Sequence, residues 1–268
     1  MRPTRQFVAL DLETTGLLAD SDRVVEIGAV RFDAQGLELD RFEQLVNPGR
    51  PMPRAAQAVH GISDADLVAA PPAREVLPRF LAFLGDPVET TLLAHNAVFD
   101  ASFLGRELGR LGRTPPSHAI VDTLALARTR LPHLPNHRLD SLARRLDLDP
   151  DGPHRALADS LRVKGLWLAL SRPDDVENAD CLIAYPILDV NRPSSAPVGW
   201  DRVNEAIERG WKVRLVYLGG TRGDSPRDVT PRQFVNRGGM PYLVAFCHLD
   251  ALEKSFRLDR VRHFEVVS

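Results

Sequence analysis

Asp11-Leu12-Glu13-Thr14-Thr15-Gly16 follows the apolar run Phe7-Val8-Ala9-Leu10, and the fold can be read outward from this stretch. A short, continuous apolar run that ends in a Thr/Gly turn is typical of a buried central strand. Because residues two apart on a strand point to the same side, Asp11 and Glu13 project together. Two such carboxylates repel each other and lose hydration, which is costly unless a cation lies between them. For an arbitrary Asp-x-Glu, however, a solvated strand end is the commoner outcome.

Strand and helix patterns alternate in the residues that follow. Residues 24–32 and 41–46 are predicted strands, and the short turn between them implies antiparallel pairing. Two further strands are predicted at 91–95 and 119–121. Helices are predicted over the following ranges: 73–84, 99–111, 123–130, 139–146 and from just after Pro153 to about Leu170. This order predicts an α/β fold with a mixed five-stranded sheet flanked by helices.

The composition changes near Arg172, and a segment rich in Pro and Ser follows at 186–199. We therefore predict a first domain over 1–172, a linker over 173–198 and a second domain over 199–268. In the second domain one helix is predicted at 201–209. Short strands are predicted after it over these ranges: 212–218, 233–236, 242–247 and 261–267. Short strands in a tail of this length predict a small β-barrel.

Charge is distributed unevenly along a chain of 268 residues whose net charge is −2. Residues 199–268 hold 12 Lys and Arg against 9 Asp and Glu, whereas the remainder holds 22 against 27. The near-neutral sum argues against a protein that coats nucleic acid by bulk attraction. An acidic first part suits a carboxylate metal site, and a mildly basic tail suits contact with an anionic polymer.

The composition also bounds the compartment. Hydrophobic residues make up 44% and charged residues 26%, as in an ordinary globular protein with a sizeable core. The sequence has only two cysteines, Cys181 and Cys247, far apart along the chain. No apolar run is long enough to span a membrane, and the first residues lack the apolar stretch of a signal peptide. We therefore expect a cytoplasmic protein without a disulfide framework or membrane contact.

Further acids follow the first strand at positions that suit the same edge of a sheet. Asp100 ends His95-Asn96-Ala97-Val98-Phe99-Asp100, directly after a strand, and Asp159 ends His154-Arg155-Ala156-Leu157-Ala158-Asp159, early in a helix. Taken singly, Asp100 could be a helix N-cap and Asp159 an exposed helical acid. Strand ends and helix starts at one edge of an α/β sheet are, however, where sites form.

Together these side chains suit one chemistry. Two hard divalent cations held by carboxylate oxygens are what hydrolysis of a phosphodiester needs, because one acidifies a water and the other neutralises the leaving oxygen. A nearby histidine such as His154 can take the proton of the attacking water, since imidazole titrates in the right range.

The motifs D-L-E-T-T-G, H-N-A-x-F-D and H-x-x-x-x-D resemble, in this order, the DEDDh superfamily of 3′–5′ exonucleases. The resemblance is greatest to the branch with the proofreading subunit of bacterial replicative polymerase, and it spans about residues 5–172. It implies a ribonuclease H-like fold, two Mg²⁺ or Mn²⁺ ions, and hydrolysis from the 3′ end of single-stranded DNA or RNA. It also implies that Asp11, Glu13, Asp100 and Asp159 are metal ligands, with Asp11 bridging both ions, and that His154 is the general base. A polymerase or a DNA repair complex would be its partner.

Further residues are similar to those that contact the 3′-terminal nucleotide in this superfamily. They are Thr14, Leu17, His60 (in Val59-His60-Gly61-Ile62), Asn96 and Phe99. Simple core packing is an equally good account of Leu17. Asp122 also recurs in the superfamily, but we interpret it as a helix cap.

Residues from about 199 resemble the WYL domain, a small SH3-like β-barrel of bacterial regulators. The resemblance is carried by four segments, namely 213–217, 227–231, 241–246 and 256–261. Pro241 stands where the namesake Trp of that family is expected. The resemblance implies binding of single-stranded nucleic acid or a nucleotide-like effector, with Arg214, Arg257 and Arg260 as candidate phosphate contacts. The alternative is that these arginines pair with Asp224, Asp228 and Asp259.

Two functions of different classes remain open at this stage. The first is a metal-dependent 3′–5′ exonuclease whose tail binds nucleic acid or a regulatory ligand. The second is a regulatory protein that binds an effector or nucleic acid and uses the exonuclease fold as a scaffold. Four carboxylates beside a histidine favour the first, since a scaffold has no need of them. DNA or RNA preference and oligomeric state are not legible.

Overall fold

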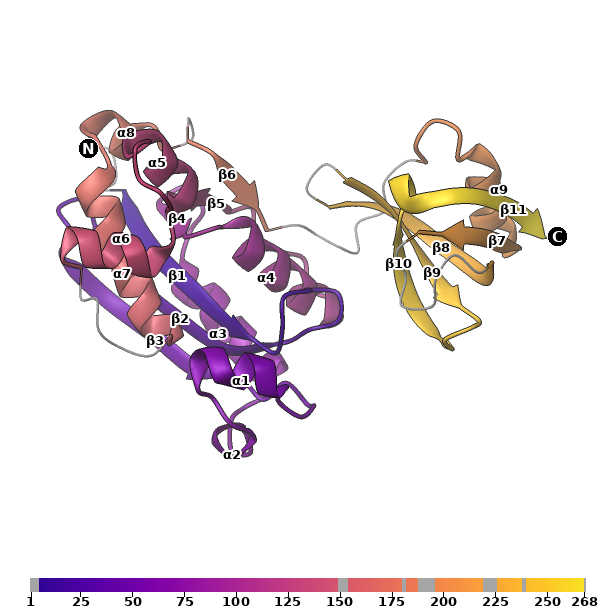
Figure 1. Ribbon diagram of the computed structural model, residues 1–268, viewed down its shortest axis with the longest axis horizontal. Helices are drawn as coiled ribbons and strands as arrows, with labels where there is room; N and C mark the ends of the chain where they lie inside the picture. Colours follow the sequence, from indigo (N-terminus) through magenta and orange to yellow (C-terminus); the bar gives the residue numbers. More distant parts are fainter. Residues whose placement is uncertain are drawn as a thin grey trace. The chain divides into compact units, whose positions relative to one another are not determined.

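The computed structural model describes residues 5–148, 154–179, 182–187, 196–218, 226–237 and 240–267. The chain forms two compact units, residues 1–189 and 190–268, and each is described by itself (Figure 1). Residues 188–195, in the predicted linker, and Asp224 lie outside the described residues, as does Cys181. Cys247 is a buried free thiol. Among the described residues, no helix is both long and apolar enough to cross a membrane.

The first unit is built on a mixed sheet with the strand order β3-β2-β1-β4-β5-β6. Its strands are β1 (Gln6–Thr14), β2 (Val24–Asp33), β3 (Glu38–Leu45), β4 (Thr90–Ala94), β5 (Ala119–Asp122) and β6 (Ala184–Pro186). β1 pairs antiparallel with β2 and parallel with β4, so it lies in the middle of the sheet. A strand in that position is covered on both faces, which explains the continuous apolar run at its start.

Helices cover both faces of this sheet (Figure 1). They are α1 (Arg54–His60), α2 (Asp64–Leu67), α3 (Ala73–Leu84), α4 (Val98–Arg110), α5 (Thr123–Arg130), α6 (Leu139–Leu146), α7 (Ala156–Leu170) and α8 (Pro173–Glu177). Val8 and Leu10 of β1 belong to the core cluster with residues of α3 and α4. Phe7 and Ala9 belong to the opposite cluster, with residues of α7. By strand alternation Asp11 and Glu13 therefore face α7.

Two features of β2 bring the start of α7 onto the sheet. Gly28 pairs with Asp11, and a Cβ at Gly28 would lie 2.1 Å from the backbone of Ala156 and Leu157. Only glycine therefore allows this approach. Glu26 accepts hydrogen bonds from the Arg155 guanidinium and, at 2.9 Å, from the Ala156 backbone N–H. A carboxylate at the N-terminus of a helix satisfies a free N–H and interacts well with the helix dipole.

The sheet differs from the predicted five strands by one. β6 pairs antiparallel with β5, and it lies with α8 inside residues that we predicted as linker. Its three residues are too few to show a strand pattern. The predicted domain limits stay a prediction, but the ordered first unit continues past residue 172. The short helices α1 and α2 were also not predicted, because neither is long enough to show a helical period.

The second unit contains one helix, α9 (Asp201–Arg209), and an antiparallel sheet with the order β10-β9-β8-β7-β11. The strands are β7 (Lys212–Tyr217), β8 (Arg227–Arg237), β9 (Met240–Cys247), β10 (Leu252–Arg257) and β11 (Val261–Val267). Val203 and Ala206 of α9 pack on the core of this sheet, and Trp200 stacks on Phe264. In the described part of the tail, β10 and β11 do not pair with each other. The described strands thus form an open antiparallel sheet, and they do not show the predicted small barrel.

Candidate metal-dependent nuclease site

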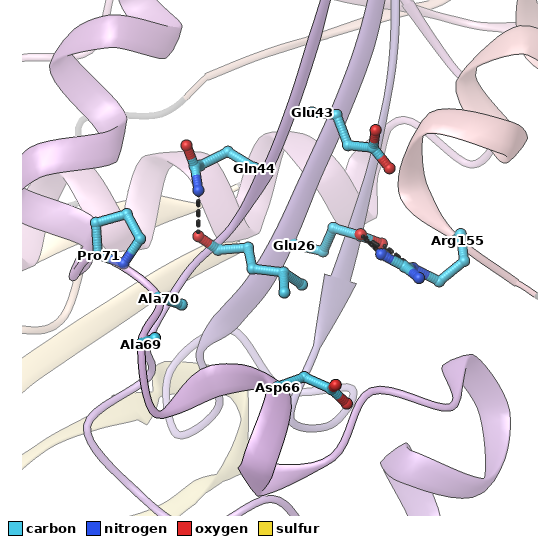
Figure 2. A pocket seen from close by; sticks show the side chains of 9 residues that line it. Glu26, Glu43, Gln44, Asp66, Ala69, Ala70, Pro71 and Arg155 are labelled. Carbon is cyan, nitrogen blue, oxygen red and sulfur yellow. Dashed lines mark hydrogen bonds and ion pairs between the residues drawn. The ribbon is translucent and has the colours of Figure 1, made fainter.

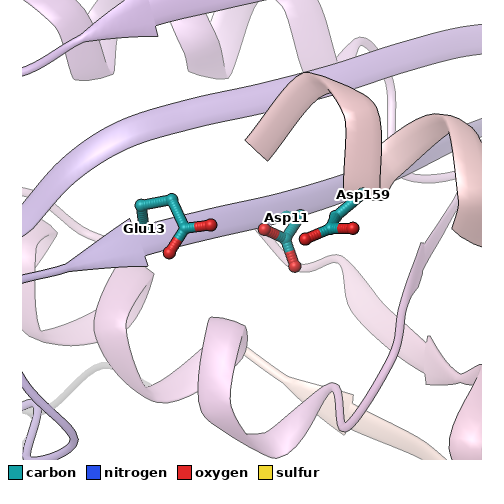
Figure 3. Close-up of side chains that lie close together, drawn as sticks. All are labelled: Asp11, Glu13 and Asp159. Atoms are coloured by element: carbon teal, nitrogen blue, oxygen red, sulfur yellow. The ribbon is translucent and has the colours of Figure 1, made fainter. Parts of the chain in front are cut away.

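Three carboxylates from two elements meet on the α7 face of the sheet. Asp11 and Glu13 lie on β1 and Asp159 lies in the first turn of α7. One carboxylate oxygen from each lies within 4.8 Å of the other two, and Figure 3 shows all three side chains turned toward one space. The sequence predicts that Asp11 and Glu13 lie on the same side of β1. Their contact with Asp159 joins residues 146 to 148 positions apart, and it depends on Gly28 and Glu26, which place α7 on the sheet.

Asp100 adds a fourth carboxylate from the other helical layer. It lies in the first turn of α4, whose N-cap is Ala97, so Asp100 is not the cap itself. Its side chain is 2% exposed, and Oδ1 is buried with no hydrogen-bond partner. Asp100 is not one of the three carboxylates that lie within 4.8 Å of one another, but its charge is the first of the neighbouring charges that raise the pKa of Asp11. A buried oxygen without a donor is the kind of atom that a cation would satisfy.

The electrostatics of these acids reflect their proximity. Burial raises the pKa of Asp11 well above its usual range, and the charges of Asp100, Asp159 and Glu13 raise it further. Burial, followed by the charges of Asp159 and Glu26, raises the pKa of Glu13 to about 8. Burial likewise raises the pKa of Asp100 well above its usual range. The fold thus holds these acids in surroundings that disfavour their charge unless a cation compensates it.

His154 lies at the open side of this cluster. Its Nδ1 is 3.3 Å from Oδ2 of Asp159, its Nε2 is 3.9 Å from Oδ2 of Asp140, and 41% of its side chain is exposed. An imidazole beside the carboxylates and open to solvent can reach a substrate that enters the site. Asp140, on α6, was not among the residues singled out from the sequence, because an acid on a helix carries no motif of its own.

The residues predicted to contact a nucleotide fall on three segments near the carboxylates. Thr14 ends β1, and its hydroxyl donates to the Gly16 carbonyl at 2.6 Å. Leu17 is 83% exposed, so the core-packing account of this residue is wrong. His60 is buried at the end of α1, and its Nδ1 accepts from the Ile62 N–H, while Nε2 has no partner. Burial lowers the pKa of His60.

Asn96 lies in the turn that leads into α4, and Phe99 lies in the first turn of that helix. Asn96 has a left-handed φ of 69°, and its N–H donates to Asp122 Oδ1 at 3.0 Å. The same carboxylate oxygen accepts from the Leu124 N–H and caps α5. The interpretation of Asp122 as a structural cap is therefore confirmed. By holding this turn, Asp122 fixes the start of α4 and with it Asp100.

Glu26 and Arg155 were not predicted as part of the site, although Arg155 lies between two quoted residues of a motif. Their ion pair borders a pocket of about 430 Å³, which Figure 2 shows. The lining includes three carboxylates, those of Glu26, Glu43 and Asp66, against the single guanidinium of Arg155. This charge makes the pocket a poor place for a phosphate. The pair therefore acts by positioning α7.

Two of the three tail arginines singled out from the sequence pair with acids. Arg214 donates to both carboxylate oxygens of Asp228, at 2.8 and 3.1 Å, and Arg257 donates to Asp259. These contacts lower the pKa of both aspartates. The alternative of intramolecular pairing is thus observed for Arg214 and Arg257. No ion pair of the Arg260 side chain is found in the described part of the tail.

The donor set fits hard divalent cations. It consists of carboxylate oxygens, which Mg²⁺ and Mn²⁺ prefer, on two strand positions and two helix starts. The unpartnered Oδ1 of Asp100 and the raised pKa values of Asp11 and Glu13 are the marks of a site that lacks its positive charge.

Comparison with known families agrees with this site. The profile of the Exonuclease family matches residues 8–165, which include all four carboxylates and His154. The chain therefore belongs to the Exonuclease family and is a nuclease. A second profile, that of the WYL domain, matches residues 200–266. The resemblance to DEDDh exonucleases joined to a WYL domain is confirmed.

Relatives of known identity match the first unit. The chain is 38% identical over 178 residues to DNA polymerase III subunit epsilon of Treponema pallidum, a match that covers 66% of this chain and 81% of that protein. It is 38% identical over 171 residues to the PolC-type DNA polymerase III of Bacillus cereus, covering 64% of this chain and only 12% of that much longer polymerase.

Solved structures of low sequence identity share the fold. The nuclease domain of 3′hExo, described as a DEDDh family member bound to rAMP, matches 68% of this chain and 97% of its own with a TM-score of 0.55 at 18% identity. Exonuclease I matches 90% of this chain and 55% of its own with a TM-score of 0.57 at 17% identity. The first unit thus has the ribonuclease H-like exonuclease fold.

Proposed function

We propose that this protein is a 3′–5′ exonuclease that removes nucleotides from single-stranded DNA or RNA with two divalent cations, Mg²⁺ or Mn²⁺. The observation that carries the proposal is the convergence of Asp11, Glu13 and Asp159 within 4.8 Å, together with the unpartnered Oδ1 of Asp100, whose charge acts on Asp11. The names of its relatives, which include a polymerase III subunit, support a nucleic acid substrate and a polymerase or a repair complex as partner.

Each predicted residue has a role in this mechanism. Asp11, Glu13, Asp100 and Asp159 would hold the cations, with Asp11 shared between them. When bound, the cations supply positive charge for the scissile phosphate and make a water acidic enough to attack near neutral pH. His154, which is open to solvent and 3.3 Å from Asp159, accepts the proton of that water. Thr14, Leu17, His60, Asn96 and Phe99 hold the terminal nucleotide.

The exposed side chain of Leu17 is suited to this positioning role. It follows the strand that carries Asp11 and Glu13, so an apolar surface is presented close to the carboxylates. A nucleotide base offers the complementary apolar face, and stacking on such a surface tolerates any base. In the second unit, Arg214, Arg257 and Arg260 would contact nucleic acid or a regulatory ligand, on a domain that the family resemblance describes as a small barrel.

A degradation assay tests this proposal. Strands of DNA and of RNA, labelled at the 3′ end or the 5′ end, are incubated with the full chain and Mg²⁺ or Mn²⁺. The expected result is immediate release of the 3′ label as a mononucleotide, with the 5′-labelled strand shortening stepwise. EDTA and Asp11→Ala are expected to abolish both. A protein that binds these strands and never shortens them, with either ion, contradicts the proposal.

A further inference from the structure

A buried arginine lies against the metal-ligand candidate of α7. Arg162 follows Asp159 by one helical turn, so the two side chains share a face of the helix. Nη1 of Arg162 donates to Oδ1 of Asp159 at 2.6 Å, and the side chains are 5% and 7% exposed. A guanidinium at this depth bears its full positive charge, because arginine does not lose its proton in proteins.

This contact distinguishes Asp159 from the other three carboxylates. Among the described residues, neither Asp11, Glu13 nor Asp100 makes an ion pair with a lysine or an arginine. The pKa values of these three are raised by burial first and by neighbouring carboxylates second. The protein itself therefore provides Asp159 with a positively charged partner, Arg162, as a bound cation would.

Two consequences follow for a cation at this site. Oδ1 of Asp159 already accepts a hydrogen bond from Arg162, so Oδ2, the oxygen that faces His154, is the one more available to a cation. In addition, the positive charge of Arg162 repels any cation that Asp159 binds. Because the pair is buried, water and salt screen this repulsion only weakly.

We propose that Arg162 is a resident counterion of the metal centre, which favours Oδ2 of Asp159 as the ligand oxygen and lowers the affinity of the site for divalent cations in the absence of substrate. Arg162 is thus a positioning residue, since it acts through Asp159 and is buried away from a substrate. The inference rests on the proposed function, because it presupposes that these carboxylates bind cations.

Cation binding without nucleic acid provides the test. The affinity of the full chain for Mn²⁺ is measured by isothermal titration calorimetry at pH 8.5, where Glu13, with a pKa of about 8, is largely ionised. Arg162→Met removes the charge and keeps an apolar stem of similar length. We expect Mn²⁺ to bind at least about tenfold more tightly to this variant. Arg162→Lys keeps the charge, and its affinity should stay within about threefold of the unaltered chain.

Arg130→Met is the matched control, because it removes a half-buried arginine from an aspartate, Asp175, that is not part of the carboxylate cluster. Its Mn²⁺ affinity should not change. A purely structural role of Arg162 would loosen Mn²⁺ binding in Arg162→Met or leave it unaltered, and either result overturns the inference. If Arg162→Met does not fold, Arg162→Gln, which is neutral and can still donate to Asp159, replaces it with the same expected tightening. If the unaltered chain binds no Mn²⁺, the proposed function itself fails.

Discussion

The first unit contains two kinds of buried carboxylate, and the difference between them separates folding from function. Glu26 is fully buried and accepts from the Arg155 guanidinium and the Ala156 N–H. Glu107, 1% exposed, accepts from two arginines, Arg23 and Arg110, and from the Val24 N–H. Each of these acids has donors for its oxygens, as buried charges require.

Within the part of the chain that the structure describes, Asp11, Glu13 and Asp100 have no arginine or lysine partner of this kind. Asp100 is buried and Asp11 is half-buried, and the pKa values of both are raised well above the usual range. Glu13, directly opposite Glu26 in the β1–β2 ladder, has a pKa of about 8. A fold that can supply guanidinium partners to Glu26 and Glu107 does not supply them here. Without a cation these acids are neutralised by protons, and a bound divalent cation would replace those protons; that is the physical basis of the metal proposal.

The largest effect should come from removing a member of the uncompensated set. Asp11→Asn is expected to lower the rate of phosphodiester hydrolysis by about 10³-fold or more, because charge stabilisation at the reacting phosphate is lost. The metal-free variant should be at least as stable as the unaltered chain, since one repelling carboxylate is gone. The rate is followed with a 3′-labelled strand, and stability by thermal melting in EDTA.

Asp40→Asn serves as the control for this substitution, because Asp40 is an exposed residue on β3. It should leave both the rate and the melting temperature unchanged. Hydrolysis by Asp11→Asn at more than a tenth of the original rate would show that Asp11 does not hold a cation.

The compensated set should respond in the opposite way. Glu26→Gln breaks an ion pair with Arg155 and a cap of α7, so we expect the free energy of unfolding to fall by about 3 kcal/mol. This is the lower end of the usual range, because the Arg155 side chain keeps 39% of its surface in water. Urea denaturation in EDTA measures the loss. An unaltered midpoint would remove the distinction between the two kinds of carboxylate.

The pH dependence of stability sharpens the comparison. Glu13 titrates near 4.5 when unfolded and near 8 when folded, so the metal-free folded state holds a proton that the unfolded state releases between these pH values. Stability must therefore fall as the pH rises through that window. We expect the melting temperature in EDTA to drop by several degrees between pH 5 and pH 8.5, and excess Mg²⁺ to reverse much of the drop.

Glu13→Gln should flatten this dependence, because the titrating group is absent. If the melting temperature in EDTA instead rises with pH over this range, the raised pKa of Glu13 is not a property of the folded protein.

Much of this arrangement could be predicted from the sequence, for identifiable reasons. The helices at 73–84, 123–130, 139–146 and 201–209 agree with those observed, and the central strand was evident from an uninterrupted apolar run. The alternation along β1 correctly placed Asp11 and Glu13 on one side. These features depend on neighbours within one element, and local periodicity reports them directly.

Features that depend on distant contacts could not be predicted. β6 has three residues and is a strand only because β5 lies beside it, and β10 has three charged residues among its six, which suits a sheet edge but shows no regular strand pattern. The meeting of Asp159 with β1 depends on the approach of α7 over Gly28, which no spacing reveals. Arg162 looked like an ordinary helical arginine, although its position three residues after Asp159 was a usable signal of pairing.

The smallest effects should come from the second unit, where arginines with an acidic partner can be compared with an arginine that has none in the described part of the tail. Arg214 is neutralised by Asp228, whereas the described part of the tail provides no ion pair for Arg260. In the Asp11→Asn background, which prevents degradation, Arg260→Ala should weaken binding of a single-stranded oligonucleotide about threefold and reduce its salt dependence. Arg214→Ala should change the affinity by less than about twofold, because an exposed ion pair contributes little.

Fluorescence anisotropy at two salt concentrations distinguishes these outcomes. A larger loss of affinity for Arg214→Ala than for Arg260→Ala would mean that the Asp228 pair opens to admit a phosphate. In that case, a charged side chain without an intramolecular partner would not be the one that binds a ligand. That result would also weaken the metal proposal for the carboxylates of β1. The two proposals share one premise, namely that a ligand neutralises a charge for which the protein itself provides no partner.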